Sequence, residues 1–80
     1  MEVAALFTLH SLSGGAQTGH FSPEAVASKF RSDLRGDVKE ALGELVRDPR
    51  GYVLVKPTSG GLTYGITKRG VERLRILKMI

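Results

Sequence analysis

Apolar and polar positions alternate with helical spacing most regularly in the middle of the chain. The apolar positions there are Leu34, Val38, Ala41, Leu42, Leu45 and Val46. Side chains at the spacing i, i+3, i+4, i+7 and i+8 lie on one face of a helix, and burial of that face against the protein core stabilises it. The pattern predicts a helix over residues 33–48, with Ser32 or Asp33 as its cap or a later start at Gly36.

Two shorter apolar stripes precede this helix. Residues 2–12 carry Val3, Leu6 and Phe7 on one side, which predicts a helix with a wide apolar face. Ser22 followed by Pro23 is a strong helix start, because the serine can cap a free backbone N–H and proline has no N–H to lose. It predicts a second helix over residues 23–31. Two helices joined by so short a turn must cross steeply, as in a helix-turn-helix motif.

The last third of the chain changes to a strand pattern and then returns to a helix. Residues 52–56 and 62–66 are rich in β-branched and aromatic side chains. The five residues 57–61 between them contain proline and glycine, which predicts a β-hairpin with a loop. Thr67 is then a cap for a helix over residues 68–79. The expected fold is one α+β domain over residues 1–80, mainly helical, with a small β-hairpin.

Composition narrows the class of protein. Eighty residues allow one domain with a small core, and a core of this size favours self-association. The absence of cysteine excludes disulfides and thiolate zinc sites. No apolar run approaches the roughly 18 to 20 residues that span a bilayer, and Met1 is followed by an acid instead of a basic leader. We expect a cytoplasmic protein, and the initial methionine favours a complete chain.

The charge is unevenly distributed along the chain. Residues 1–48 hold five basic and seven acidic residues, a net charge of −2, whereas residues 49–80 hold seven basic residues and one acid, a net charge of +6. A basic segment of this kind indicates a polyanionic partner. The alternative is a basic helix that only keeps the protein in solution.

The order helix, helix, helix, hairpin, helix resembles the winged helix-turn-helix domain of small bacterial and archaeal transcription regulators. The matching segments are SPEAVASKF, DVKEALGELVRD, GYVLV, LTYGIT and ITKRGVERL. The ending is similar to that of PadR-like and MarR-like regulators, with Tyr64, Thr67, Gly70 and Leu74 at the matching positions. The resemblance covers nearly the whole chain.

The resemblance implies binding of double-stranded DNA, with the third helix in the major groove and the hairpin, or wing, on the neighbouring backbone. The candidate DNA-binding residues are Arg31, Ser32, Arg35, Lys39, Gly43, Lys56, Thr58, Ser59, Lys68 and Arg69. Arg35 and Lys39 have side chains that can contact guanine edges or phosphates, or they are ordinary surface charges. Gly43 either admits a DNA backbone or permits close packing.

Apolar residues at the end of the chain indicate a homodimer. Ile76, Met79 and Ile80 give more apolar surface than an 80-residue monomer readily covers. A symmetric dimer of such domains implies a palindromic DNA site, with its two halves about one helical turn apart.

The acids of the third helix support a different hypothesis. The predicted helix, residues 33–48, carries three basic and five acidic side chains, a net charge of −2. Carboxylates near phosphates are repelled, so the same fold can instead be a module that binds other proteins. The two hypotheses differ in salt dependence, because DNA binding weakens steeply as salt increases.

Other functions have little support in the sequence. The spacing of Gly14 and Gly19 imitates a phosphate-binding loop, but His20 stands where that motif needs lysine. His10 and His20 lie in unrelated settings, so we expect neither a catalytic site nor a metal site, and no cofactor or small-molecule ligand is evident.

Overall fold

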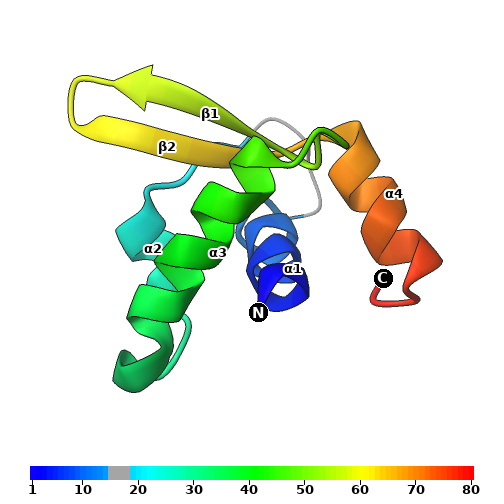
Figure 1. Cartoon of the computed structure of the whole chain (residues 1–80), viewed down its shortest axis with the longest axis horizontal. Coiled ribbons are helices and arrows are strands. Elements are labelled where there is room, and N and C mark those ends of the chain that lie inside the picture. The colour runs from blue at the N-terminus through cyan, green and yellow to red at the C-terminus, as the bar shows by residue number, and fades with distance from the viewer. Residues whose placement is uncertain (15–18) are drawn as a thin grey trace.

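The computed structural model describes residues 1–14 and 19–80 of the chain. Its elements are α1 (Glu2–Leu12), α2 (Pro23–Ala27), the 3-10 helix η1 (Ser32–Leu34), α3 (Arg35–Arg47), β1 (Val53–Thr58), β2 (Gly61–Ile66) and α4 (Lys68–Ile76). Figure 1 shows α1 between α3 and α4, with the hairpin of β1 and β2 lying across one end of the helices. The mixed α+β class expected from the sequence is confirmed. Most of the glycine-rich loop between Gly14 and Gly19 lies outside the described residues.

α2 is shorter than the helix predicted over residues 23–31. Its start is as expected, because the hydroxyl of Ser22 accepts a hydrogen bond from the N–H of Ala25 at 3.1 Å. After Ala27 the chain tightens, since Lys29 and Phe30 donate to carbonyls three residues back instead of four, at 3.2 and 3.0 Å. Such bonds are typical of a 3-10 turn that closes a helix.

The entry into α3 also differs from the prediction. Neither Ser32 nor Asp33 caps the helix, and the chain enters α3 through the 3-10 turn η1. The carboxylate of Asp33 instead accepts a hydrogen bond from Arg31 at 3.3 Å. α3 ends before Asp48, which is extended as expected for a residue that precedes proline.

The hairpin is tighter than predicted. The strands are antiparallel with Val53 opposite Ile66 and Thr58 opposite Gly61, so the turn contains two residues, 59 and 60, instead of five. β2 has a second neighbour that the sequence did not reveal. Phe21 and Tyr64 exchange both backbone hydrogen bonds, at 2.8 and 2.7 Å, which ties the segment before α2 to the hairpin.

α4 begins where predicted and ends earlier. Thr67 accepts a hydrogen bond from the N–H of Gly70 at 3.1 Å and donates one to the carbonyl of Gly51 at 2.5 Å. At the other end, Lys78 adopts a positive φ of 59°. Met79 donates to the carbonyl of Leu74 and Lys78 to that of Arg75, the pair of bonds of a Schellman motif. The helix predicted over residues 68–79 therefore stops at Ile76.

One apolar core joins all the helices and the base of the hairpin. Its buried residues are Ala5, Leu6, Leu9, Val26, Ala27, Val38, Ala41, Leu42, Leu45, Val53, Ile66, Val71 and Leu74. The predicted inward stripe of the third helix is correct at its four buried positions, whereas Val46 is half-buried and packs at the edge. Among the helices in the described part of the chain, none combines the length and hydropathy that crossing a bilayer would require.

Candidate nucleic-acid interface

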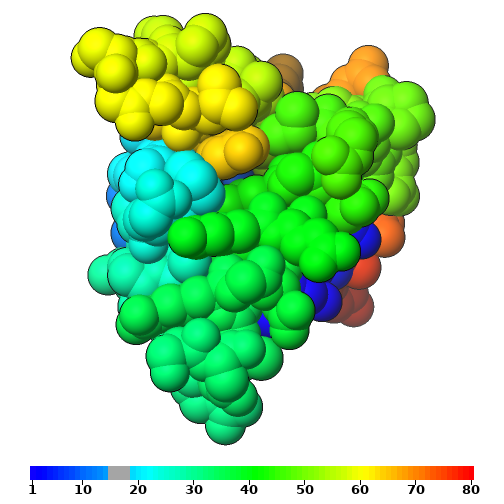
Figure 2. Space-filling model, turned by 60° about the vertical axis from the view of Figure 1, so that its left-hand side comes forward, coloured from blue at the N-terminus to red at the C-terminus, as the bar shows by residue number. Residues whose placement is uncertain are grey.

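The exposed side of α3 follows from the position of its buried side. Val38, Ala41, Leu42 and Leu45 face the core, and at about 100° per residue the opposite side carries Gly36, Glu40, Gly43 and Arg47. Figure 2 shows this side of α3 running across one face of the molecule, with α2 beside it and the end of the hairpin above. The three elements thus form a single continuous surface.

The basic residues on this surface differ in how far they are engaged. Lys39 lies 3.8 Å from Glu24 of α2, and Arg31 lies 3.3 Å from Asp33. Within residues 1–14 and 19–80, Arg35 is exposed and has no ion-pair partner. Both ion pairs are exposed to solvent, so each contributes at most about 1 kcal/mol to stability. Each cation can therefore exchange its carboxylate partner for another anion.

Gly43 does not serve close packing within the chain. A methyl group at this position would lie 3.6 Å from the guanidinium of Arg47 and would meet no backbone atom within 4 Å. The space above the glycine is filled by a flexible side chain that can move away. The alternative that Gly43 permits tight internal packing is therefore wrong. Because glycine has no side chain, another molecule can approach the helix backbone closely at this position.

The hairpin offers fewer free donors than its sequence suggested. Thr58 already donates its hydroxyl proton to the carbonyl of Gly61 at 2.7 Å, inside the turn. Ser59 is exposed in the turn, and Lys56 is exposed and, in the described residues, without an ion-pair partner. Lys56 is the one cation in residues 53–66, which form the hairpin.

One flank of α3 is acidic. Asp37, Glu40 and Glu44 line a shallow groove of about 340 Å³ together with Glu2 at the start of α1. Arg47 at 2.9 Å neutralises Glu44, whereas the other three carboxylates have no ion-pair partner in the described structure. We call this hollow the acidic groove. It borders the surface of Figure 2 at the side where the N-terminus (blue) emerges beside α3.

Lys68 and Arg69 are not brought together with α3. They line a groove of about 410 Å³ with Arg50, Tyr52 and Arg73, between the start of the hairpin and the first turns of α4. We call it the basic groove. Arg50 and Arg73 were not among the candidate residues, because they lie far apart in the sequence and share no motif. The guanidinium of Arg50 lies 4.9 Å from the centre of the Tyr52 ring, a cation–π contact.

Asp48 fixes Arg50 in this position. Both carboxylate oxygens accept hydrogen bonds from the Arg50 side chain, the shortest at 2.6 Å, and one also accepts from the Arg50 backbone N–H at 2.9 Å. Only 12% of the Asp48 side chain is exposed. The hydrogen bonds from the Arg50 side chain are the main reason why the pKa of Asp48 falls from 3.8 to about 2.

The Asp48–Arg50 pair predicts a specific acid sensitivity. Because the folded pKa lies below the unfolded value of 3.8, the pair stabilises the fold above that pH and the contribution is lost as pH falls through about 2. We expect Asp48→Asn to reduce the free energy of unfolding at pH 7 and the difference from wild type to vanish towards pH 2. Urea unfolding at a series of pH values measures this, and Arg50→Ala should show the same pH dependence. Parallel wild-type and Asp48→Asn profiles would contradict the assignment.

The apolar residues at the end of the chain are exposed, as a dimer surface would require. Ile76 is 69% exposed, Met79 42% and Ile80 44%. Met79 is the last residue of the Schellman motif and Ile80 follows it, so neither extends the stripe of α4.

The two histidines have different surroundings. His10 is half-buried on α1, and His20 packs against Gly65, where a methyl group would lie 2.9 Å from its Nδ1. That Nδ1 is buried and has no hydrogen-bond partner in the described structure. In the same residues, no three His, Cys, Asp or Glu side chains are grouped as a metal site requires.

No protein-family model, curated protein or solved structure matches this chain significantly. The candidate interface therefore rests on the residues and their geometry.

Proposed function

We propose that this protein binds double-stranded DNA as a dimeric winged helix-turn-helix transcription regulator, with α3 as the recognition helix and the hairpin as the wing. The observation that carries the proposal is the surface of Figure 2, in which the exposed side of α3 lies beside α2 and below the hairpin. An α-helix fits the major groove of B-DNA, which is about 12 Å wide. Gly36 and Gly43 have no side chains, so DNA can approach the backbone of α3 closely at these two positions.

Arg35 and Lys39 are the proposed principal contacts of α3. Arg35 stands at the first position of the helix, the end that enters the groove in most helix-turn-helix complexes. Lys39 follows one turn later, and DNA phosphates can replace its exposed partner Glu24. Arg31 and Ser32 precede α3, and Lys56 and Ser59 of the wing are in a position to contact the adjacent backbone. Lys68 and Arg69 are left out of this surface because they line the basic groove.

The second candidate function is a protein-interaction module. It is favoured by the acidic groove, since carboxylates along one flank of a recognition helix oppose the approach of phosphates. The ion pairs of Arg31 and Lys39 favour it too, because DNA binding must first break them. Salt dependence separates the two candidates.

A fluorescence-anisotropy titration of a mixed-sequence duplex tests DNA binding. We expect affinity to fall steeply between low and physiological salt, because neutralised phosphates release counterions. Arg35→Ala/Lys39→Ala should weaken binding about 10- to 100-fold and make the salt slope shallower by about two phosphate contacts.

A matched control removes two charges elsewhere. Lys29 lies beside Phe7 and Ser11 on α1, and Arg75 pairs with Glu72 on α4, so Lys29→Ala/Arg75→Ala lowers the net charge equally but leaves α3 intact. The control should bind nearly as wild type. Equal losses in both variants would mean non-specific attraction, and no binding at low salt would favour the protein-interaction module.

A further inference from the structure

A chain of hollows runs along one side of the molecule from the acidic groove to the basic groove. The acidic groove shares Glu2 and Glu44 with a second hollow, which continues to Asp48 and Arg50. From there a more enclosed pocket leads to the basic groove, with which it shares Arg50 and Arg73. Because each hollow shares lining residues with the next, the two oppositely charged grooves belong to one continuous surface.

The side-chain charges without an ion-pair partner are equal in number at the two ends of this surface. At the acidic end, Glu2, Asp37 and Glu40 are exposed and, within residues 1–14 and 19–80, have no ion-pair partner. At the basic end, the same part of the structure leaves Lys68, Arg69 and Arg73 unpaired. Three carboxylates without partners thus lie on the same side of the molecule as three cations without partners.

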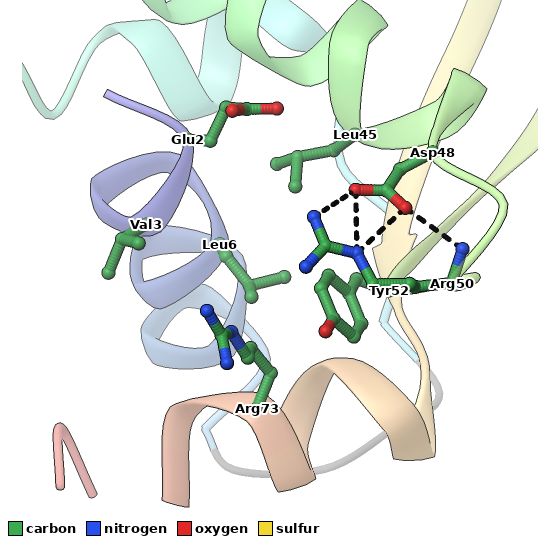
Figure 3. A pocket seen from close by; sticks show the side chains of 8 residues that line it. All are labelled: Glu2, Val3, Leu6, Leu45, Asp48, Arg50, Tyr52 and Arg73. Carbon is green, nitrogen blue, oxygen red and sulfur yellow. Dashed lines mark hydrogen bonds and ion pairs between the residues drawn. The ribbon is translucent and has the colours of Figure 1, made fainter. Parts of the chain in front are cut away.

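The pocket between the two ends has an apolar floor. Figure 3 shows Glu2 at one end of this pocket and Arg73 at the other, with Leu6 and Leu45 between them. Two exposed apolar side chains belong to the same surface. Val3 lines this pocket and is 40% exposed, and Ile76 lines the basic groove and is 69% exposed. The surface therefore combines a buried apolar floor and two exposed apolar side chains with charged ends, and a mixture of apolar and charged groups is typical of a protein interface with a polar rim.

We propose that this surface binds a second copy of the chain across a two-fold axis through the central pocket. In a two-fold dimer, the same patch on both copies must be complementary to itself. Rotation about such an axis places the acidic end of each copy against the basic end of the other, so that the six unpaired side-chain charges of each copy face charges of opposite sign. No other occupant needs to be assumed, because one chain supplies both halves of the complement.

The dimer also covers acids of α3. Asp37 and Glu40 line the acidic groove, so the partner copy would lie over that flank of α3 up to the exposed side that carries Glu40. Arg35, Lys39 and the hairpin line none of these hollows. The inference rests on the dimer of the proposed function but not on its DNA, so failure of DNA binding leaves it intact. It differs from a dimer built on Met79 and Ile80, which line none of these hollows.

Charge reversal with complementation tests the interface. The acid-reversed variant is Glu2→Lys/Glu40→Lys, and the base-reversed variant is Lys68→Glu/Arg69→Glu. Each reversed chain meets its own copy with like charges, and we expect its dimer dissociation constant to rise about 100-fold or more. An equal mixture of the two variants restores opposite charges at both ends, and we expect a heterodimer of near wild-type affinity.

The measurement is sedimentation equilibrium at low, physiological and high salt, with circular dichroism to check folding. Wild type should have twice the chain mass of 8.7 kDa and dissociate as salt increases. The controls Glu24→Lys/Asp33→Lys and Lys29→Glu/Lys56→Glu change the net charge by the same amounts outside this surface, and both should remain dimers. Rescue in the mixture also shows that both reversed chains fold.

Three results would overturn the inference. One is a wild-type protein that stays monomeric at low salt. Another is a pair of reversed variants that remain dimeric alone. The third is Met79→Ser/Ile80→Ser becoming monomeric while the reversed variants do not, which would place the dimer at the end of the chain instead.

Discussion

Gly70→Ala is expected to destabilise the protein by about 3 kcal/mol, at the upper end of what overpacking a core usually costs. Gly70 is buried in the first turn of α4. This turn packs against Tyr52, just before β1, and against Ile66, the last residue of β2. A methyl group there would overlap the carbonyl oxygen of Tyr52 and lie 2.6 Å from Cγ1 of Ile66. The clash involves backbone, so α4 must shift and strain the Thr67 cap that bonds the Gly70 N–H.

Urea unfolding followed by circular dichroism measures this effect, and the melting temperature should fall by roughly 12 to 24 °C for a domain of this size. Gly36→Ala is the matched control, because a methyl group at Gly36 meets nothing within 4 Å. On α3 the same substitution should be neutral or stabilising by about 0.5 kcal/mol, since alanine is the better helix former. Equal effects at both positions would show that helix propensity, and not the contact with Tyr52, sets the cost.

The sequence predicts those parts of this fold that depend on local periodicity. The stripe of Val38, Ala41, Leu42 and Leu45 faces the core as expected, and Ser22 and Thr67 cap their helices. These features follow from side chains a few residues apart along one helix.

The features that were missed depend on distant partners or on a single backbone angle. The pairing of Phe21 with Tyr64 joins segments more than forty residues apart, and it is a tertiary contact that no local pattern signals. The early end of α4 depends on the positive φ of Lys78, a conformation that glycine or asparagine usually provides.

The candidate site shows the same division. The sequence identified Arg35, Lys39 and the acids of the third helix, and the structure places them on two flanks of one helix. It did not reveal that Arg50 and Arg73 join Lys68 and Arg69, because this groove forms where the turn after α3 meets α4. The turn sequence Asp48-Pro49-Arg50-Gly51 was the available signal, since aspartate before a tight turn often accepts bonds from residues just beyond it.

Charge distribution connects these observations to function. The protein has a net charge of +4, which favours a polyanionic partner, but its basic residues lie on two different surfaces, the exposed side of α3 and the basic groove. A duplex on α3 would meet Arg35, Lys39 and Lys56, while the basic groove remains free for another contact. The proposed DNA surface and the proposed dimer surface therefore use different cations, and variants of one can be made without removing the other.

Leu42→Ala is expected to cost about 3 kcal/mol, within the range of 2 to 5 kcal/mol for truncation of a buried leucine. Leu42 is fully buried on α3, in the core that also contains Leu6 and Leu9 of α1. An 80-residue domain has roughly 4 to 12 kcal/mol of stability in total, so this loss leaves a substantial unfolded fraction at moderate urea concentrations. Leu54→Ala on the hairpin is the control, because that side chain is 43% exposed and should cost well under 1 kcal/mol.

The destabilised Leu42→Ala protein also reports on ligand binding without relying on α3 substitutions. A ligand that binds the folded chain alone stabilises it by about 2.7 kcal/mol when present at 100 times its dissociation constant. Duplex DNA at low salt should therefore move the Leu42→Ala unfolding midpoint most of the way back to that of free wild type. The same DNA should do much less for a triple variant that also carries Arg35→Ala and Lys39→Ala, since its recognition helix has lost both proposed contacts. If DNA stabilises both variants equally, the duplex binds elsewhere on the molecule, and the basic groove becomes the place to test.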